Sequence, residues 1–314
     1  MPFPTLANGR VDVQVTNILQ AYTNPDFVAS RFFPIVPGLK DETGKIAGIS
    51  NSHLRVYDSR RALTDEGEHR MEFNLTNDDS YRVDYYDLEI YLPDRLKDQL
   101  QRPFDARRDA GIVLMQALML EREAALATAI TSTAIMTNNT TLSGTSQWND
   151  FANSDPMADI EAARTAIHAK IGREANCMFL SRKAFNTLKR HPQYLAHVAG
   201  LKVLSGNALL GLLKDLHELD DVIIGKAIKV TSKEGQTETK AVVWNNDCVL
   251  FYRPKVGSLY EPAFGYQFLL ENQNVRVDVR RHQNDLGDIV RNMWAYQDKI
   301  LDVNAAYLIK TVVA

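Results

Sequence analysis

Cysteine is scarce in this chain, and the two that occur, Cys177 and Cys248, lie far apart in its 314 residues. Two distant cysteines do not form the disulfide framework of a small secreted domain, although a single bridge between them stays open. The first residues, MPFPTLANGR, lack the positive segment and following apolar segment of a secretion signal. Both absences favour a reduced, cytoplasmic setting.

An excess of positive charge is missing as well. The chain has 36 Lys and Arg residues against 39 Asp and Glu residues, and its net charge is −3. Proteins that bind DNA regardless of sequence carry a basic excess, because their cations neutralise phosphates. We therefore expect any contact with nucleic acid to be local and weak.

Long uninterrupted apolar runs are also absent. The longest, AGIVLMQALMLEREAALATAI, is interrupted by Gln116 and then by Glu121, Arg122 and Glu123. Charges in the middle of a bilayer are costly, so this run does not read as a simple membrane span. The apolar content of 45% is still enough for a large buried core, and the length suggests about two domains.

The motifs of common catalytic and metal sites do not occur. The seven histidines form no HxxxH or HxH pair, no GxSxG is present, and GLKDETGK does not join a buried strand to a helix as a phosphate loop does. Paired acids such as Asp78-Asp79 and Asp220-Asp221 suit turns or helix caps. We therefore predict no catalytic, metal or cofactor-binding residue, and no cofactor.

The stretch ANCMFLSRKAFNTLKRHPQYL raises the question of a nucleophile and its base. Cys177 lies in an apolar strand, where burial raises the pKa of a thiol, so we interpret it as a core residue. His191 precedes a proline at a helix end, where a partly positive imidazole suits the helix dipole. A hydrolase using Cys177 remains an alternative, and a Cys177→Ala variant that loses a reproducible turnover would support it.

The first 38 residues contain five prolines, which prevent a compact helical or central-strand domain. We predict an extended arm with one strand or short helix in VDVQVTNILQAY. The phrase FFPIVP places Phe32 and Phe33 in this arm. Because an arm has few contacts of its own, a partner subunit could cover these rings, and both are candidate intersubunit contacts.

Residues 39–92 are polar, with alternating patterns in HLRVYD and SYRVDYYDLEIYL. The alternation predicts strands that form a long two-stranded projection, which is marginal in water unless it docks against something. Charged residues at its loop suit ion pairs between subunits. The candidate contacts in this segment are Arg60, Arg61, Asp65, Glu66, Glu68 and Arg70.

A helical period follows. Asp94 can cap a short helix that Pro103 breaks, and a second helix runs from near Phe104 to near Thr133, about thirty residues and roughly 45 Å long. Its apolar residues lie nearly all round between Ala110 and Leu120, which predicts burial on several faces.

The rest of the chain alternates helices and strands. Asp155 and Pro156 open a helix that stops at Gly172, and Ser181 caps another helix after the strand NCMFLS. The Leu-rich helix in GNALLGLLKDL precedes strands around 222–224 and 227–230, a hairpin in SKEGQTETKAVVW and the strand CVLFY. The pattern predicts an α/β unit and a tail of strands that returns toward the long helix.

The order of these segments resembles the tailed-phage major capsid proteins of the HK97-like fold. The quoted parts are LSGTSQWNDFANSDP before DIEAARTAI, ANCMFLSRKAFNTLKRHP, DVIIGKA and KILDVNAAYLIKTVV. The resemblance implies an α+β fold with an N-terminal arm (1–38), an extended β-hairpin loop (39–92) and a peripheral domain with a long spine helix (93–195). An α/β axial domain (196–254) and a return to the axial and peripheral sheet (255–314) complete it.

The same resemblance implies a structural, non-enzymatic role: pentamers and hexamers of one polypeptide that form an icosahedral shell around double-stranded DNA. It implies a virion protein assembled in the host cytoplasm, with a portal and optional decoration proteins as partners and no membrane. Since the chain starts directly at the arm, we expect either a separate scaffolding protein or none. The alternative is an encapsulin-like compartment of the same fold that encloses an enzyme cargo.

Overall fold

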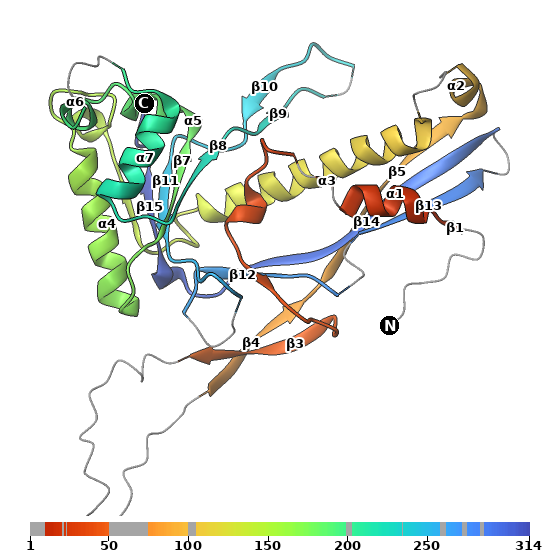
Figure 1. Cartoon of the computed structure of the whole chain (residues 1–314), viewed down its shortest axis with the longest axis horizontal. Helices are drawn as coiled ribbons and strands as arrows, with labels where there is room; N and C mark the ends of the chain where they lie inside the picture. The colour runs from red at the N-terminus through yellow and green to blue at the C-terminus, as the bar shows by residue number, and fades with distance from the viewer. Residues whose placement is uncertain are drawn as a thin grey trace, which may run out of the picture.

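The computed structural model describes residues 10–20, 22, 24–49, 75–99, 105–198, 203–233, 235–257, 262–271, 275–282 and 286–314. A long helix, α3 (Ala106–Ile130), links a helix-covered sheet at one end to a long, narrow sheet that runs beneath it (Figure 1). The arrangement is elongated because the two sheets lie side by side along the helix instead of being stacked into one core.

Helix α3 is the predicted spine. Asp105 is its N-cap and accepts hydrogen bonds from the backbone N–H groups of Arg107 and Arg108. The helix ends at Thr131, and its 25 residues make it about 37 Å long, shorter than the predicted 45 Å. The prediction of a spine helix is confirmed, although the helix starts about two residues later and ends about three residues earlier than predicted.

The long sheet is built on β14 (Gly287–Ile300), which pairs with β13 (Val275–His282), with β5 (Asp84–Pro93) and with β12 (Gly265–Phe268). Two short arm strands, β1 (Arg10–Val11) and β2 (Ile35–Val36), add to β13 and β12. Helix α3 packs on this sheet, and the Asn292 side chain donates from Nδ2 to the Gly111 carbonyl at 2.7 Å. Apolar side chains of α3, β13 and β14 form the core between them.

A two-stranded sheet of β3 (Thr43–Ile49) and β4 (Leu75–Arg82) leaves the body at its lower end in Figure 1. The two strands agree with the predicted two-stranded projection, although the predicted strand in HLRVYD lies outside the described residues. Tyr81 stacks on Phe268 at 4.7 Å at the base of the projection. Strand β5 belongs to the long sheet, so the projection ends before residue 84 and not at 92. The six charged candidates between Arg60 and Arg70 lie outside the described residues.

The second sheet has the order β6–β15–β11–β7–β8. Its strands are β6 (Asn139–Thr141), β15 (Ala306–Lys310), β11 (Cys248–Phe251), β7 (Cys177–Ser181) and β8 (Asp221–Gly225). Around it lie α4 (Pro156–Ile171), α5 (Arg182–Leu188), α6 (Pro192–Ala196) and α7 (Gly206–Leu216), as Figure 1 shows. The predicted starts and stop are present: Asp155 and Ser181 cap α4 and α5, and Gly172 ends α4 at φ 66°.

The predicted boundary between residues 195 and 196 cuts through this second sheet. Strand β7, placed in the peripheral domain by its position in the sequence, pairs with β8 on one side and β11 on the other. Strand β15, from the end of the chain, completes the sheet beside β11. The boundary is therefore corrected: adjacency in the sequence had grouped β7 with α3, but strand pairing groups it with the α/β unit.

The arm lies on the chain itself from residue 10 onward. Helix α1 (Val13–Gln20) packs across α3 where Gly111 lacks a side chain: a Cβ there would come within 3.2 Å of Val15 and Leu19. After a short 3₁₀ helix, η1 (Ala29–Arg31), the chain reaches β2. The predicted short helix in the arm is confirmed, and glycine in α3 is what lets it pack so closely.

Candidate functional site at the junction of the two sheets

The most buried charge in the described residues lies where the arm, α3 and the second sheet meet. The Glu123 side chain on α3 is fully buried and accepts hydrogen bonds from Val28 N at 3.0 Å, Ala29 N at 2.7 Å and Trp244 Nε1 at 2.6 Å. Burial raises the pKa of Glu123, although the three donors and the neighbouring Arg122 act in the opposite direction. Both carboxylate oxygens are occupied, so this group fastens three segments together and offers no free base.

Two aromatic residues of the arm, Phe32 and Phe33, pack into the core of the same chain. Phe32 stacks on Trp244 at 5.3 Å and on Phe251 at 5.2 Å, and Phe33 packs against Phe264 at 5.5 Å. Their exposed fractions are 0% and 2%. The prediction that a partner subunit covers Phe32 and Phe33 is therefore wrong, because the core of the same chain already covers both rings.

The neighbouring residue on α3 points to the other sheet. Arg122 makes a two-point ion pair with Asp298 of β14, with Nε–Oδ2 at 2.6 Å and Nη2–Oδ1 at 2.8 Å. Its guanidinium also lies 5.2 Å from the ring centre of Trp294 and 5.1 Å from that of Tyr296. The pair is nearly buried, with 5% and 9% of the two side chains exposed. Such desolvated, two-point contacts are specific in geometry.

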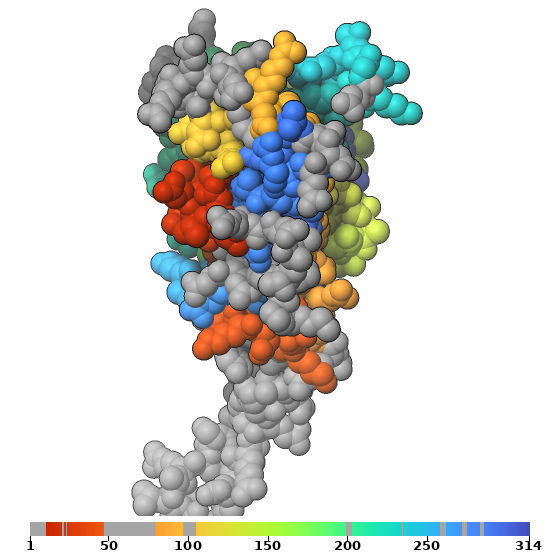
Figure 2. Space-filling model, turned by 90° about the vertical axis from the view of Figure 1, so that its right-hand side faces the viewer, coloured from red at the N-terminus to blue at the C-terminus, as the bar shows by residue number. Residues whose placement is uncertain are grey.

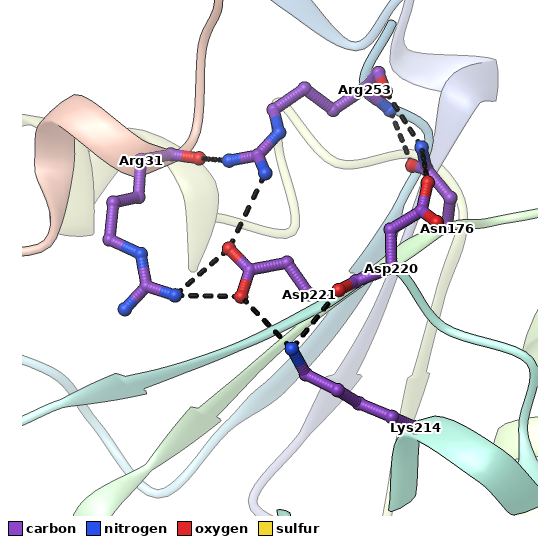
Figure 3. Close-up of polar contacts among 6 residues, drawn as sticks. All are labelled: Arg31, Asn176, Lys214, Asp220, Asp221 and Arg253. Carbon is purple, nitrogen blue, oxygen red and sulfur yellow. Dashed lines mark hydrogen bonds and ion pairs between the residues drawn. The ribbon is translucent and has the colours of Figure 1, made fainter. Parts of the chain in front are cut away.

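A second polar cluster holds the arm to the start of β8 (Figure 3). Arg31 donates from Nη2 to both carboxylate oxygens of Asp221, at 2.7 and 2.9 Å. Arg253 reaches the same carboxylate at 3.3 Å, and Lys214 lies 3.8 Å from it. Burial acts to raise the pKa of Asp221, but the hydrogen bond and charge of Arg31, with Arg253 and Lys214, hold it below its ordinary value.

Asn176 connects Arg253 and Asp220 within this Asp221 cluster through three hydrogen bonds. Its Oδ1 accepts from Arg253 N at 2.8 Å, while its Nδ2 donates to the Arg253 carbonyl at 2.8 Å and to Asp220 Oδ2 at 3.1 Å. Arg253 in turn donates to the Arg31 carbonyl. As Figure 3 shows, the arm, the loop before β7, the start of β8 and the loop after β11 all meet in this cluster. The contacts fix the arm and the second sheet relative to each other.

The arginine doublets Arg107-Arg108 and Arg280-Arg281 also form ion pairs within the chain. Arg107 contacts Asp288 at 2.7 Å, and Arg280 contacts Glu89 at 2.9 Å. Arg281 contacts both Asp94 and Asp288. These cations therefore tie α3, α2 (Asp94–Gln99) and the strands of the long sheet together.

The Cys177 thiol is a core group, as predicted. Its exposed fraction is 0%, and burial raises its pKa to about 12. Cys177 lies opposite Phe251 and Cys248 opposite Leu180, at opposite ends of the paired strands, and both cysteines are free. This geometry does not suit a nucleophile, since the described surroundings supply neither access nor a base.

His191 has partners of its own. Its Nε2 lies 3.1 Å from Ser154 Oγ, and its Nδ1 accepts from Gln193 N at 3.4 Å as the cap of α6. Burial lowers the pKa of His191. An Nδ1 that accepts a hydrogen bond carries no proton itself. The expected partly positive imidazole at a helix C-terminus is wrong, because the ring caps the start of the next helix.

We expect both cysteines to resist modification in the folded chain. A pKa near 12 for Cys177 lowers its thiolate fraction at pH 8 by about a thousandfold relative to an ordinary thiol. Reaction with 5,5′-dithiobis(2-nitrobenzoic acid) should therefore be slower by at least that factor in buffer than in urea. Rapid reaction of the native chain, lost in Cys177→Ala, would show that the thiol is accessible.

A buried histidine predicts how stability depends on pH. Burial lowers the pKa of His217 to about 4, with nearby Arg164 acting in the same direction, and Tyr194 Oη lies 3.2 Å from its Nε2. The unfolded chain binds this proton near pH 6.5, so its stabilising contribution is complete above that value and is lost as the pH falls toward 4. Between pH 7.5 and 5, we expect His217 to account for about 2 kcal/mol of lost unfolding free energy.

Urea unfolding at several pH values checks this expectation. His217→Gln retains a hydrogen-bonding side chain but does not titrate, so the loss between pH 7.5 and 5 should shrink by about 2 kcal/mol. His168→Gln, at an exposed histidine of α4, is the matched control for the substitution itself. Equal slopes in the His217→Gln variant and the unaltered chain would contradict the assignment.

Neither a metal-binding cluster nor a membrane-spanning helix is found in the described part of the chain. No group of three or more His, Cys, Asp and Glu side chains there is placed to hold a metal ion. No helix among those residues is both long and apolar enough to cross a bilayer. The notable side chains are instead Glu123, Arg122 and Asp221, which the sequence had shown only as charges that interrupt an apolar run or end a helix.

The whole length of the chain is similar to one phage protein. It is 30% identical over 309 residues to the major capsid protein of Burkholderia phage BcepMu, and the match covers 96% of this chain and 96% of that one. The chain belongs to the phage major capsid proteins. No protein-family model matches it.

Solved structures confirm the HK97-like fold of this major capsid protein. A phage-related protein of Bordetella bronchiseptica RB50 is 24% identical, with a TM-score of 0.75 over 97% of this chain and 98% of its own. The SrpI encapsulin of Synechococcus elongatus PCC 7942 is 10% identical, with a TM-score of 0.54 over 93% and 89% of the two chains. Both likenesses show a shared fold alone.

Proposed function

We propose that this major capsid protein assembles as pentamers and hexamers of one polypeptide into an icosahedral shell that encloses double-stranded DNA. The observation that carries the proposal is the end-to-end match to a phage major capsid protein, 96% of both chains, which leaves no large part of either unaccounted for. The encapsulin-like alternative is weaker, because it rests on a fold shared at 10% identity.

The shape of the subunit supports an assembling role. The β3–β4 sheet stands away from the body, and a single chain gains little from such a projection unless a neighbour covers it. The predicted ion pairs among Arg60, Arg61, Asp65, Glu66, Glu68 and Arg70 of adjacent subunits belong to this proposal. In contrast to this projection, the rest of the subunit is held together by the buried contacts of Glu123 and Arg122.

The charge distribution supports confinement of DNA in place of tight binding. The net charge is −3, and several arginines of the long sheet already form ion pairs within the chain. Cations that are already paired release fewer counterions from phosphate, so isolated capsomers should bind DNA weakly. Strong, steeply salt-dependent DNA binding by capsomers would contradict this part of the proposal.

Cryo-electron microscopy of the full chain, expressed alone and with the neighbouring genes of its phage, tests the proposal. We expect closed shells with pentamers at the vertices, and coexpression tests the need for the predicted scaffolding protein and the place of the portal and decoration proteins. A chain that stays monomeric under every assembly condition would overturn the proposal. Native shells filled with an enzyme and free of nuclease-protected DNA would favour the encapsulin-like role.

A further inference from the structure

A small hairpin on the α/β unit has no partner among the described residues. Strands β9 (Ile228–Val230) and β10 (Lys240–Val242) pair only with each other, with Val242 opposite Ile228 and Lys240 opposite Val230. Figure 2 shows this segment, in cyan, standing out from the body of the molecule. Both of its faces are therefore open to solvent over most of their length.

One face of this hairpin carries three apolar side chains and a lysine. Ile228, Val230 and Val242 share it with Lys240, because residues two apart in a strand and residues directly opposite point to the same side. Their exposed fractions are 56%, 52% and 57%. A two-stranded hairpin is marginal in water by itself, and three β-branched side chains held in the open on it indicate a surface that is covered in an assembly.

The charge of the hairpin restricts what can cover it. Four lysines line the described part of residues 226–243, and Glu238 is the acidic side chain described there; it pairs with Lys240 at 3.7 Å. The lysines are Lys226, Lys229, Lys233 and Lys240. A complementary partner must combine negative charge with apolar side chains.

The same chain has such a surface at the other end of β8. Arg164 is nearly buried, with 10% of its side chain exposed, and contacts Glu161 at 3.4 Å, Glu174 at 2.7 Å and Glu218 at 3.3 Å. These carboxylates are 58% to 77% exposed. One arginine against three carboxylates leaves an acidic face, and the partly buried Leu212 and Leu216 of α7 precede Glu218 in the chain.

The two surfaces are placed for contact between copies and not within one. Glu218 of the acidic face lies three residues before the start of β8, whereas the hairpin begins three residues after the end of β8. In Figure 1, α4, which carries Arg164 and Glu161, lies on the opposite side of the α/β unit from β9 and β10. Complementary patches on opposite sides of one subunit give a head-to-tail contact, which forms a ring where the rotation between successive copies closes.

We propose that hairpin β9–β10 of one copy docks on the acidic face around Arg164 of the next copy. This inference deepens the proposed shell function and rests on it. The apolar side chains of the hairpin cover the partly buried Leu212 and Leu216 of the neighbour's α7. The lysines of the hairpin meet Glu174 and Glu218 of the same neighbour. The contact is heterologous, so each subunit in a ring uses its hairpin once and its acidic face once.

Charge exchange in the full chain tests the contact. Lys229→Glu with Lys240→Glu should reduce the yield of assembled particles at least tenfold, as should Glu174→Lys with Glu218→Lys, while the combined four-site variant should regain most of the yield. Glu121→Lys with Glu271→Lys, at exposed acids elsewhere, is the mismatched control and should not rescue the hairpin variant. Circular dichroism establishes that each variant is folded.

A second variant separates the apolar contribution from charge. Ile228→Thr, Val230→Thr and Val242→Thr together keep β-branched side chains and should still lower assembly at least tenfold. Full assembly of this variant and of both charge-reversed variants would overturn the inference while shells of the unaltered chain upheld the proposed function. If the unaltered chain formed no shells, the proposed function would fail, and sedimentation velocity would then test the docking separately. Rings or dimers that are lost in the hairpin variants would support the docking. Association that is the same in the unaltered chain and in every variant would overturn it.

Discussion

Replacing Glu123 with alanine is expected to lower the free energy of unfolding by about 3–5 kcal/mol. The substitution leaves Val28 N, Ala29 N and Trp244 Nε1 buried without an acceptor. Each buried donor without a partner costs about 1–3 kcal/mol, and relief from burying the carboxylate offsets part of the sum. Glu123→Gln should cost less, because one oxygen still accepts while its amide N–H groups face other donors.

Urea unfolding of the full chain, kept below its assembly concentration and followed by far-ultraviolet circular dichroism, measures these effects. Glu121→Ala, at an exposed acid two residues earlier on α3, is the matched control and should change stability by less than about 0.5 kcal/mol. A Glu123→Ala variant as stable as this control would mean that the arm does not depend on the carboxylate.

Replacing Arg122 with methionine is expected to have an effect of similar size, about 3–5 kcal/mol. The substitution preserves much of the side-chain volume but leaves Asp298, 9% exposed, as a buried carboxylate without its two-point partner. It also removes the cation that lies over the rings of Trp294 and Tyr296. The loss therefore falls on the contact between α3 and the long sheet, on a face of the helix about 100° from that of Glu123.

A double-mutant cycle checks that this loss arises from the unpaired carboxylate. Adding Asp298→Asn to Arg122→Met should recover about half of the lost free energy, because a neutral amide costs less to bury than an unpaired charge. Arg108→Met, at an arginine with 41% of its side chain exposed beside Asp109, should be nearly neutral. Strictly additive effects of the Arg122 and Asp298 substitutions would show that the pair is not coupled.

These two adjacent charges connect α3 to different parts of a thin, elongated subunit. Glu123 ties α3 to the arm and to the tryptophan beside the second sheet, and Arg122 ties the same turn of α3 to β14. Consecutive helical residues point about 100° apart, so one turn reaches both sides. A subunit that must repeat one shape through a shell benefits from fixed orientation at this junction, while the projections adapt to their neighbours.

Local signals were sufficient for most elements. The Asp155-Pro156 start, the Gly172 stop and the Ser181 cap are where the sequence placed them, because a cap depends on backbone groups within a few residues. Cys177 was also interpreted correctly, since an apolar run of strand length predicts burial whatever its partners are. The same reasoning did not show that β5 leaves the projection for the long sheet, because its exposed alternation suits either place.

The sequence by itself determined that this chain has a long spine helix, capped shorter helices, a two-stranded projection and no motif of a common active site, and the order of these parts indicated its family. Tertiary structure alone decided that Phe32 and Phe33 lie in the chain's own core, that β7 joins β8 and β11, and that the charges interrupting α3 are its buried anchors. The physical reason is distance along the chain: caps and periodicity act within a few residues, whereas Glu123 meets Val28 and Trp244 only after about a hundred residues on either side have folded against it.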